Sequence, residues 1–464
     1  MATRVLDPVE CSAQPLDIAF HPSKEILAAG LVDGTVEFHD YSLNMKSNVA
    51  RKENADEDDT ILSSIEVHVS ESPKIKLKTP LRVNPISSCR ATVFSFLGDM
   101  LYTGSSGGSI SAIDVTKASN HHTSDGSLLW KIDNASPFGI NAIFYMKPSN
   151  PKVGDCLVTG DDEGVIRIWD LRICGTVMNY EKRAEDAFKN CIGLPKGCIA
   201  SFHENSDFIS SFQVDSSGDT LLAASADGTL TVIDLRNDCK EGQKVIKRGV
   251  EPVKLHQKTE QGPFRLHRRS DDQEDELLSM CIMKGGRKVV CGTQDGILNF
   301  WSWNTWGDIS DRFPGHPKSI DALLKVDEDT LLTGSNDGIV RVLQLQPDKL
   351  LGVLGDHNGF PVEKLRFGAN NRVIGSVSYD TMIRMWDASI FNDDGDNDAI
   401  EDTETSAVAD DRDALMANGG ESEDDWEDVD SDDSMDDSDS DDNEKGRKRS
   451  QKLKTENELF FEDL

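Results

Sequence analysis

The chain has 464 residues, of which 83 are acidic and 49 basic, giving a formal net charge of −34. No stretch reaches the roughly 18 consecutive apolar residues of a membrane span, and the first ten residues carry acids where a secretory signal needs an apolar run. We therefore expect a soluble protein without a membrane partner. The nine cysteines are scattered, and none forms a Cys-x-x-Cys pair, which indicates reduced thiols and an intracellular location and gives no sign of a metal site.

The charge is concentrated at the C-terminal end. Residues 392–444 hold 25 acidic residues and one arginine, whereas residues 445–464 hold six basic and four acidic residues. The other 391 residues carry 42 basic and 54 acidic side chains. This distribution predicts a mildly acidic folded body over residues 1–391 with an acidic tail that ends in a basic segment.

Seven copies of a short pattern run along the first 391 residues. In each copy a turn, usually acidic, precedes alternating apolar residues that often close on Trp-Asp. The turn positions are Asp33, Gly107, Glu163, Asp227, Asp295, Asp337 and Asp380. The last two intervals are 42 and 43 residues, which is the period of a β-propeller blade. The pattern predicts an all-β, seven-bladed propeller, a fold that usually serves as a docking platform, so we expect no enzyme and no cofactor.

The first copy predicts strands at Leu16–Phe20, Ile26–Gly30 and Thr35–His39, with Asp33-Gly34 as the turn where glycine tolerates positive φ. The same argument places the other six blades at residues 91–114, 141–170, 208–236, 277–303, 320–345 and 362–387. Extra length falls in polar stretches near residues 44–72, 117–133, 173–205 and 237–274. We interpret these as insertions after third strands, in outer strands or in loops to the next blade.

The last blade lacks an outer strand of its own, because only four residues, 388–391, separate its third strand from the acidic tail. We predict that residues 4–9 supply that strand and so close the ring. The alternative is a disordered N-terminus.

Four polar or aromatic residues of the last blade match a hydrogen-bonded relay: His357, Ser378, Asp380 and Trp386. We expect His–Asp and Ser–Trp pairing in a buried network that pins the turn. The set also has the composition of a catalytic triad, an interpretation that the spacing disfavours. No catalytic residue, phosphate-binding loop or metal-ligand motif is predicted elsewhere.

Two neighbouring blades end in a sharper pattern, Trp169-Asp170-Leu171-Arg172 and Ile233-Asp234-Leu235-Arg236. The arginine offers a planar fork of donors for partner carboxylates or carbonyls. The pattern resembles the box of WD-repeat proteins that act as substrate receptors of cullin-4 ubiquitin ligases, whose arginine contacts the ligase adaptor. The matching positions are Glu163, Trp169, Asp170 and Arg172 in one copy and Asp227, Asp234 and Arg236 in the other. The alternative is that Arg172 and Arg236 form salt bridges within their blades.

The stretch at residues 237–274 is locally basic. Two interpretations stay open: it contacts RNA or an acidic partner, or it is a solvated loop. The acidic tract at residues 392–444 is predicted to be disordered, and either engages basic partners or acts as a solubilising spacer. Three serines have an acid three residues on and are candidate phosphosites: Ser422, Ser434 and Ser438.

The final segment, residues 445–464, combines a basic cluster with an apolar end. The cluster predicts nuclear targeting and consists of Lys445, Arg447, Lys448, Arg449, Lys452 and Lys454. The terminal residues Phe460, Phe461, Asp463 and Leu464 form either a linear motif for a partner groove or a hydrophobic terminus without a role.

Taken together, the seven repeats, the acidic Ser/Asp tail, the basic cluster and the terminal Phe-Phe-x-Asp-Leu resemble the WD repeat-containing protein 55 family. Residues 275–279, 285–294, 301–313 and 326–329 are also similar to that family. The resemblance implies a nuclear, often nucleolar, protein with a role in ribosomal RNA processing. We expect a non-enzymatic scaffold, monomeric outside its complexes, that works with pre-ribosomal assembly factors, with some of it in the cytoplasm. In plants, the resemblance also implies a link to the cullin-4 ligase adaptor, so a substrate receptor is the alternative function.

Overall fold

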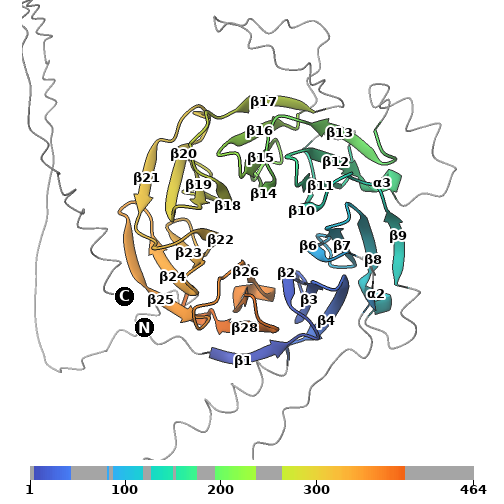
Figure 1. Cartoon of the computed structure of the whole chain (residues 1–464), viewed down its shortest axis with the longest axis horizontal. Coiled ribbons are helices and arrows are strands. Elements are labelled where there is room, and N and C mark those ends of the chain that lie inside the picture. Colours follow the sequence, from blue (N-terminus) through green and yellow to red (C-terminus); the bar gives the residue numbers. More distant parts are fainter. Residues whose placement is uncertain are drawn as a thin grey trace, which may run out of the picture. The chain divides into compact units, whose positions relative to one another are not determined.

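The computed structural model describes residues 5–42, 81–82, 87–118, 127–149, 153–174, 194–236 and 264–391. These residues form seven four-stranded antiparallel sheets in a ring (Figure 1), which confirms the predicted seven-bladed propeller. The candidate phosphosites, nuclear-targeting cluster and terminal motif lie outside the described residues.

The blades follow one another in chain order, and each consists of four strands that are ordered from the inside of the ring outward. The first blade consists of β2 (Pro15–Phe20), β3 (Ile26–Leu31), β4 (Thr35–Asp40) and β5 (Leu81–Arg82). The second consists of β6 (Cys89–Phe94), β7 (Met100–Ser105), β8 (Ile110–Asp114) and β9 (Leu128–Ile132). The third consists of β10 (Ile140–Met146), β11 (Cys156–Asp161), β12 (Ile166–Asp170) and β13 (Cys198–Phe202). The fourth consists of β14 (Ile209–Val214), β15 (Thr220–Ser225), β16 (Leu230–Asp234) and β17 (Arg265–Arg269).

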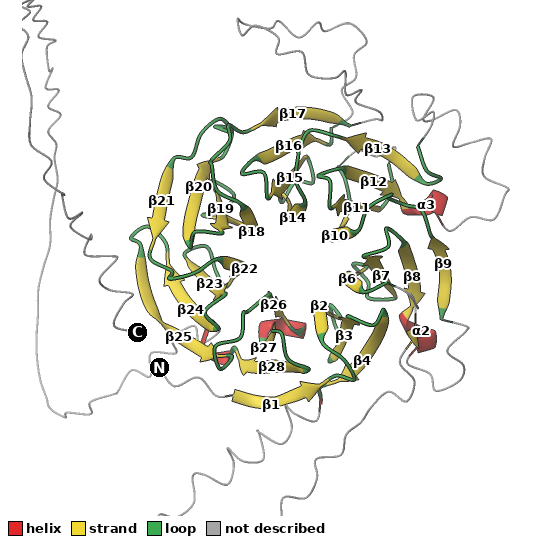
Figure 2. Ribbon diagram, viewed as in Figure 1, coloured by secondary structure: helices red, strands yellow, loops and turns green. Residues whose placement is uncertain are grey.

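The fifth blade consists of β18 (Leu277–Met283), β19 (Lys288–Thr293), β20 (Ile297–Ser302) and β21 (Asp311–Pro314). The sixth consists of β22 (Ile320–Lys325), β23 (Thr330–Ser335), β24 (Ile339–Gln344) and β25 (Lys349–Asp356). The seventh consists of β26 (Lys364–Phe367), β27 (Val373–Val377), β28 (Met382–Asp387) and β1 (Val5–Glu10). Short helical turns are α2 (Val115–Ala118), α3 (Leu171–Cys174), η2 (Ala369–Asn371) and η3 (Ser389–Phe391), and strands make up nearly all of the ring (Figure 2). Among the described helices, none is long and apolar enough to cross a bilayer.

Three of the stretches interpreted as insertions contain outer strands. β9 lies within residues 117–133, β13 within 173–205, and β17 within 237–274. In each case the outer strand comes late in the stretch, so the chain leaves the third strand, continues outside the described residues, and returns to complete the blade.

The ring closes through the N-terminal strand. β1 runs antiparallel to β28, with Val5 opposite Trp386 and Glu10 opposite Met382, and a bulge falls between Leu6 and Val9. The Leu6 side chain is 4% exposed and packs in a core cluster of the first and last blades. The seventh blade is therefore built from both ends of the propeller, an arrangement that leaves no open edge between the first and last blades.

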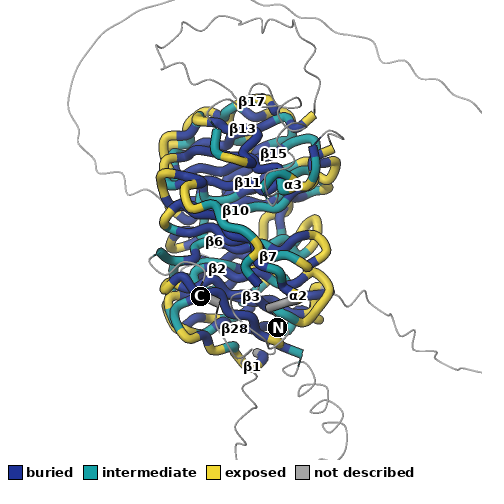
Figure 3. The backbone as a smooth tube through the Cα atoms, turned by 90° about the vertical axis from the view of Figure 1, so that its right-hand side faces the viewer, coloured by how far each residue is buried: buried dark blue, intermediate teal, exposed yellow. Residues whose placement is uncertain are grey.

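The core lies between the blades, as the second strand of the fourth blade illustrates. Leu221 and Ala223 pack in a cluster with the third blade, whereas Leu222 and Ala224 pack with the fifth. All four side chains are completely buried. A strand that is covered on both faces needs apolar residues at every position, which explains the continuous apolar runs in the second strands. Figure 3 shows these buried strands inside the ring and exposed residues at its edges.

A glycine follows the turn position in six of the seven blades, with φ from 73° to 90°. At Gly108 two features, the backbone dihedral angle and the close packing, both require glycine. Its φ is 73°, and an added Cβ would collide with the carbonyl oxygen of Ser136 in the adjacent loop. The turns of this repeat thus fix both the hairpin and the close approach of the neighbouring loop.

Candidate interaction surfaces

The ring has two faces, which are distinguished by the loops that they carry. The turn-side face carries the seven turns between second and third strands. The helix-side face carries the connections that follow third strands, including α2 and α3, which lie on the same side of the ring in Figure 3. The loops between first and second strands open on the helix-side face as well, because successive antiparallel strands reverse direction.

Arg172 lies in α3 on the helix-side face and is held by the last residue of β12. Its Nε donates to Asp170 Oδ1 at 2.9 Å, and a terminal nitrogen donates to Oδ2 at 2.5 Å. The Asp170 side chain is completely buried, whereas the Arg172 side chain is 55% exposed. An added Cβ at Gly154 would lie 2.7 Å from Arg172 Nε, so the guanidinium lies against the backbone of Gly154 and a larger residue there would displace it. Asp170 thus fixes the guanidinium on the protein side, and the rest of the Arg172 side chain faces solvent.

Arg236 repeats this geometry one blade further on. Its Nε and a terminal nitrogen each lie 2.9 Å from an oxygen of Asp234, and its side chain is 58% exposed. Burial works against ionisation of Asp234, but the hydrogen bonds from Arg236 outweigh it and hold the pKa of the carboxyl below its ordinary value. Both arginines therefore form the salt bridges within their blades that the alternative interpretation expected. They also face solvent, and contact with a ligase adaptor stays a prediction.

The other residues of the pattern do not share this surface. Trp169 is 1% exposed and donates from Nε1 to Thr159 Oγ1 at 3.0 Å, so it positions the end of β12 and does not touch a partner. Glu163 is exposed, but it lies in a turn on the opposite face. Asp227 also lies on the turn-side face, where it pairs with Arg269 of β17 at 3.0 Å.

The helix-side face also presents an apolar tip that sequence reasoning missed. Phe96 and Leu97 occupy the loop between β6 and β7 and are 80% and 75% exposed. They adjoin a cavity of about 660 Å³ whose lining includes Phe20, Tyr145 and Phe367. Two large apolar residues at a hairpin tip, where polar residues are usual, were the signal available in the sequence. Aromatic and arginine side chains on one face are the residue types that anchor protein interfaces.

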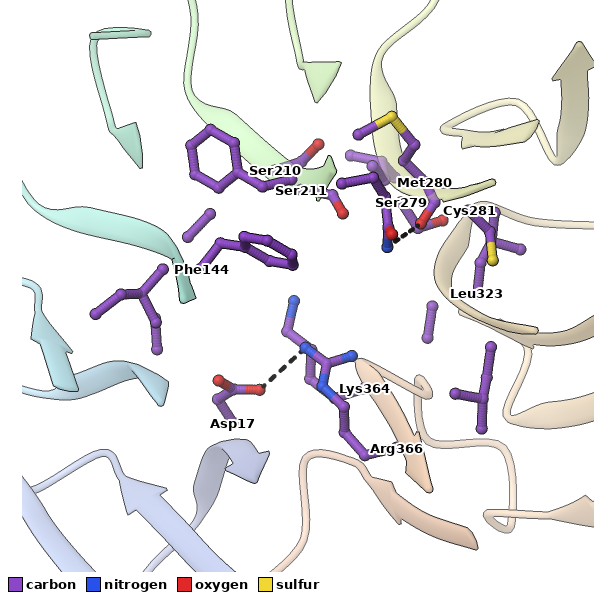
Figure 4. A pocket seen from close by; sticks show the side chains of 18 of the residues that line it. Asp17, Phe144, Ser210, Ser211, Ser279, Met280, Cys281, Leu323, Lys364 and Arg366 are labelled. Atoms are coloured by element: carbon purple, nitrogen blue, oxygen red, sulfur yellow. Dashed lines mark hydrogen bonds and ion pairs between the residues drawn. The ribbon is translucent and has the colours of Figure 1, made fainter. Parts of the chain in front are cut away.

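The inner strands surround a central cavity of about 390 Å³, shown in Figure 4. Arg366 lies 3.7 Å from Asp17, and Lys364 lines the same cavity. Burial, followed by the charge of Glu363, raises the pKa of Asp321 to about 6. The channel is thus lined by charges of both signs, which suits a polar segment of a partner more than an apolar ligand.

The hydroxyl and thiol groups of this cavity are engaged in the fold. Ser210 Oγ donates to a carbonyl of the next blade at 2.6 Å, and Ser279 Oγ does the same at 2.8 Å. Burial raises the pKa of Cys281 to about 11, so its sulfur is a thiol at neutral pH and a poor nucleophile. The two serine hydroxyls thus join neighbouring blades.

The buried network of the last blade uses a different serine from the one expected. Ser376 Oγ accepts a hydrogen bond from Trp386 Nε1 and is bonded to His357 Nε2, both at 2.7 Å. The predicted role of Ser378 is wrong, because its buried Oγ has no hydrogen-bond partner among the described residues. Asp380 accepts from the backbone of Met382 and so shapes the turn, without a bond to His357.

Comparison with known proteins places these features in a family. The model of the family "WD domain, G-beta repeat" matches residues 196–234 and 348–387. A WD repeat-containing protein JIP5 of Cryptococcus neoformans is 31% identical over 387 residues, which are 83% of this chain and 82% of the relative. WD repeat-containing protein 55 of Arabidopsis thaliana is 29% identical over 379 residues, 82% and 81% of the two chains. The chain belongs to the WD repeat-containing protein 55 family.

The two matched repeats also agree with the way the ring is built. Residues 196–234 span β13 to β16, and residues 348–387 span β25 to β28. Each sequence repeat thus begins with the outer strand of one blade and ends with the third strand of the next. A WD-repeat propeller of this family is a surface for protein–protein interaction.

Proposed function

We propose that this protein is a non-enzymatic nuclear and nucleolar scaffold in ribosome biogenesis that promotes pre-rRNA processing. The observation that carries the proposal is the similarity to the WD repeat-containing protein 55 family, which covers more than four fifths of the chain. That resemblance implies the ribosomal role and pre-ribosomal assembly factors as partners. The basic cluster at residues 445–454 supports nuclear targeting.

The helix-side face supports a docking role. It combines an exposed apolar tip at Phe96 and Leu97 with the exposed arginines of two neighbouring blades. Apolar anchors surrounded by polar groups are typical of surfaces that bind other proteins.

The proposal is tested by depleting the protein and restoring it with variants. Depletion is expected to accumulate pre-rRNA intermediates, measured by northern blotting, and the unaltered chain is expected to reverse this. A chain with Phe96→Ser and Leu97→Ser should not reverse it. The matched control is Phe360→Ser, since Phe360 is 50% exposed in a loop of the turn-side face. Unchanged intermediates after depletion would count against the ribosomal role, and rescue by the double variant would count against this docking surface.

A second candidate function is that of substrate receptor for a cullin-4 ubiquitin ligase. The specific observation is that Arg172 and Arg236 each form a two-pronged pair with an aspartate and remain more than half exposed on one face. Replacing both arginines with alanine is expected to abolish pull-down of the ligase adaptor. Arg265→Ala with Arg312→Ala is the control, because both arginines are exposed but lie on outer strands. Retention of the adaptor by the Arg172/Arg236 variant would refute the assignment.

A further inference from the structure

Three side chains with metal-binding atoms converge where the ring closes. Cys11 follows directly after β1, whereas Glu37 and His39 lie on β4. His39 Nε2 is 3.9 Å from Cys11 Sγ and 3.1 Å from Glu37 Oε2, and the three ligand atoms all lie within 4.8 Å of one another. No sequence motif indicates this cluster, because residue 11 meets residues 37 and 39 only when β1 is placed in the last blade.

The alternation of β4 explains why two of the three donors face the same way. Val36 and Phe38 pack in a core cluster shared with the second blade. Glu37 and His39 therefore point to the opposite side of the strand. Cys11 belongs to the apolar core shared by the first and last blades, so the three donors lie at the junction of those two blades. Figure 1 shows β1 beside the first blade at this junction.

The geometry is that of converging ligands. In a catalytic triad, nucleophile and carboxylate contact opposite nitrogens of the imidazole. In this cluster the thiol and the carboxylate both approach the same nitrogen, Nε2 of His39. If that nitrogen donates its proton to the carboxylate, it has no lone pair left for the thiol S–H, whereas a cation between the three atoms would coordinate all of them.

We propose that Cys11, Glu37 and His39 bind a zinc ion. Zinc accepts sulfur, nitrogen and oxygen ligands at about 2.0–2.3 Å, and a tetrahedral arrangement separates neighbouring ligand atoms by roughly 3.2–3.6 Å. The observed 3.1 and 3.9 Å separations lie within a few tenths of an ångström of that range. A water molecule would fill the fourth coordination position.

The surroundings favour a dication. The Ser12 backbone N–H lies 3.3 Å from both carboxylate oxygens, which orients the carboxylate as outer groups do in metal sites. Binding would release the Cys11 proton, and the resulting thiolate and carboxylate would balance the two charges of the ion.

The ion would cross-link segments of two neighbouring blades. Cys11 follows the strand that completes the last blade, and the other two ligands belong to the first blade. The ion would therefore fix the residue after β1 to the first blade, while β1 itself pairs with β28 of the last blade.

The test uses the full chain, purified with a chelator and then titrated with Co²⁺, whose thiolate ligation produces a charge-transfer band in the near ultraviolet. We expect a band that saturates with one ion per chain and disappears when Zn²⁺ is added. Cys11→Ser should abolish the band. Cys174→Ser, which removes a partly exposed thiol in α3, should keep it.

Thermal stability gives a second readout. Zinc at 100 times its dissociation constant should lower the unfolding equilibrium constant about 100-fold in the unaltered chain. Glu37→Gln and His39→Gln should lose most of this effect, and their circular dichroism without metal establishes whether they fold. A band that persists in Cys11→Ser, or zinc stabilisation that is equal in the unaltered chain and all variants, would place the metal elsewhere and overturn the proposal. The absence of both band and stabilisation would show that the three residues form a hydrogen-bonded cluster only.

Discussion

Ser376→Ala tests the buried network of the last blade most directly. The substitution removes the oxygen that accepts the Trp386 indole N–H and is bonded to His357 Nε2. Trp386 is 2% exposed and His357 is completely buried, so water cannot replace the lost partner. Burial, together with the charge of Arg384, lowers the pKa of His357 to about 4, so the histidine is neutral at pH 7 and the lost bonds are between neutral groups.

The magnitude follows from two buried polar atoms that lose their partner. A buried group without a partner costs about 1–3 kcal/mol. We therefore expect Ser376→Ala to lower the free energy of unfolding by about 2–6 kcal/mol, measured by urea denaturation at pH 7. The slope of free energy against urea should not change, because the buried surface is the same.

Ser378→Ala is the matched control. Both serines are completely buried and lie two positions apart, but the Ser378 oxygen has no hydrogen-bond partner among the described residues. Removal of a buried hydroxyl that is not bonded is expected to be neutral or slightly stabilising. If Ser378→Ala destabilised the protein as much as Ser376→Ala, the assignment of the network to Ser376 would be refuted.

Three further predictions concern the channel, a turn and the closing strand. Asp321→Asn should raise the free energy of unfolding at pH 7.5 by about 1–3 kcal/mol, because the folded-state pKa of Asp321, about 6, lies above the unfolded value of about 3.9. This gain should shrink as the pH falls from 6 to 4, and a gain that does not vary with pH would refute the prediction. Gly108→Ala should lower the free energy of unfolding far more than Gly286→Ala, measured by urea denaturation, because both glycines have positive φ but only Gly108 would bring a Cβ against the Ser136 carbonyl. Equal losses would show that backbone strain alone accounts for the cost and that the Ser136 contact adds nothing. Leu6→Ala should cost about 2–4 kcal/mol if β1 is an integral part of the last blade, and a loss below about 1 kcal/mol would mean that this strand contributes little.

Much of the fold could be predicted because the repeat is local. A turn residue, a following glycine and an apolar alternation lie within about ten residues, and the hairpin of second and third strands depends on those residues alone. The turn glycines adopt positive φ in six blades, as that chemistry requires. The outer strands are harder to locate, because they follow long polar stretches and their position depends on the blade that they complete.

The error over the serine has a simple structural cause. Ser376 and Ser378 are two residues apart, a spacing that places side chains on the same face of a strand. The register decides between them, because Ser376 pairs with Arg384 inside the ladder, two residues from Trp386. Ser378 lies beyond the last residue of β27 and cannot reach the indole. Register is a property of the assembled sheet, and composition does not encode it.

The arginine pattern shows how a short motif can combine residues that serve different surfaces. Glu163 precedes β12 and Arg172 follows it, and the five residues of that strand separate the two by about 17 Å. The two side chains therefore emerge on opposite faces, while Trp169 and Asp170 stay in the interior between them. A partner docked on the helix-side face meets the arginine alone. Of the remaining residues, Asp170 holds that arginine in place, and Trp169 bonds to Thr159 in the interior of the blade.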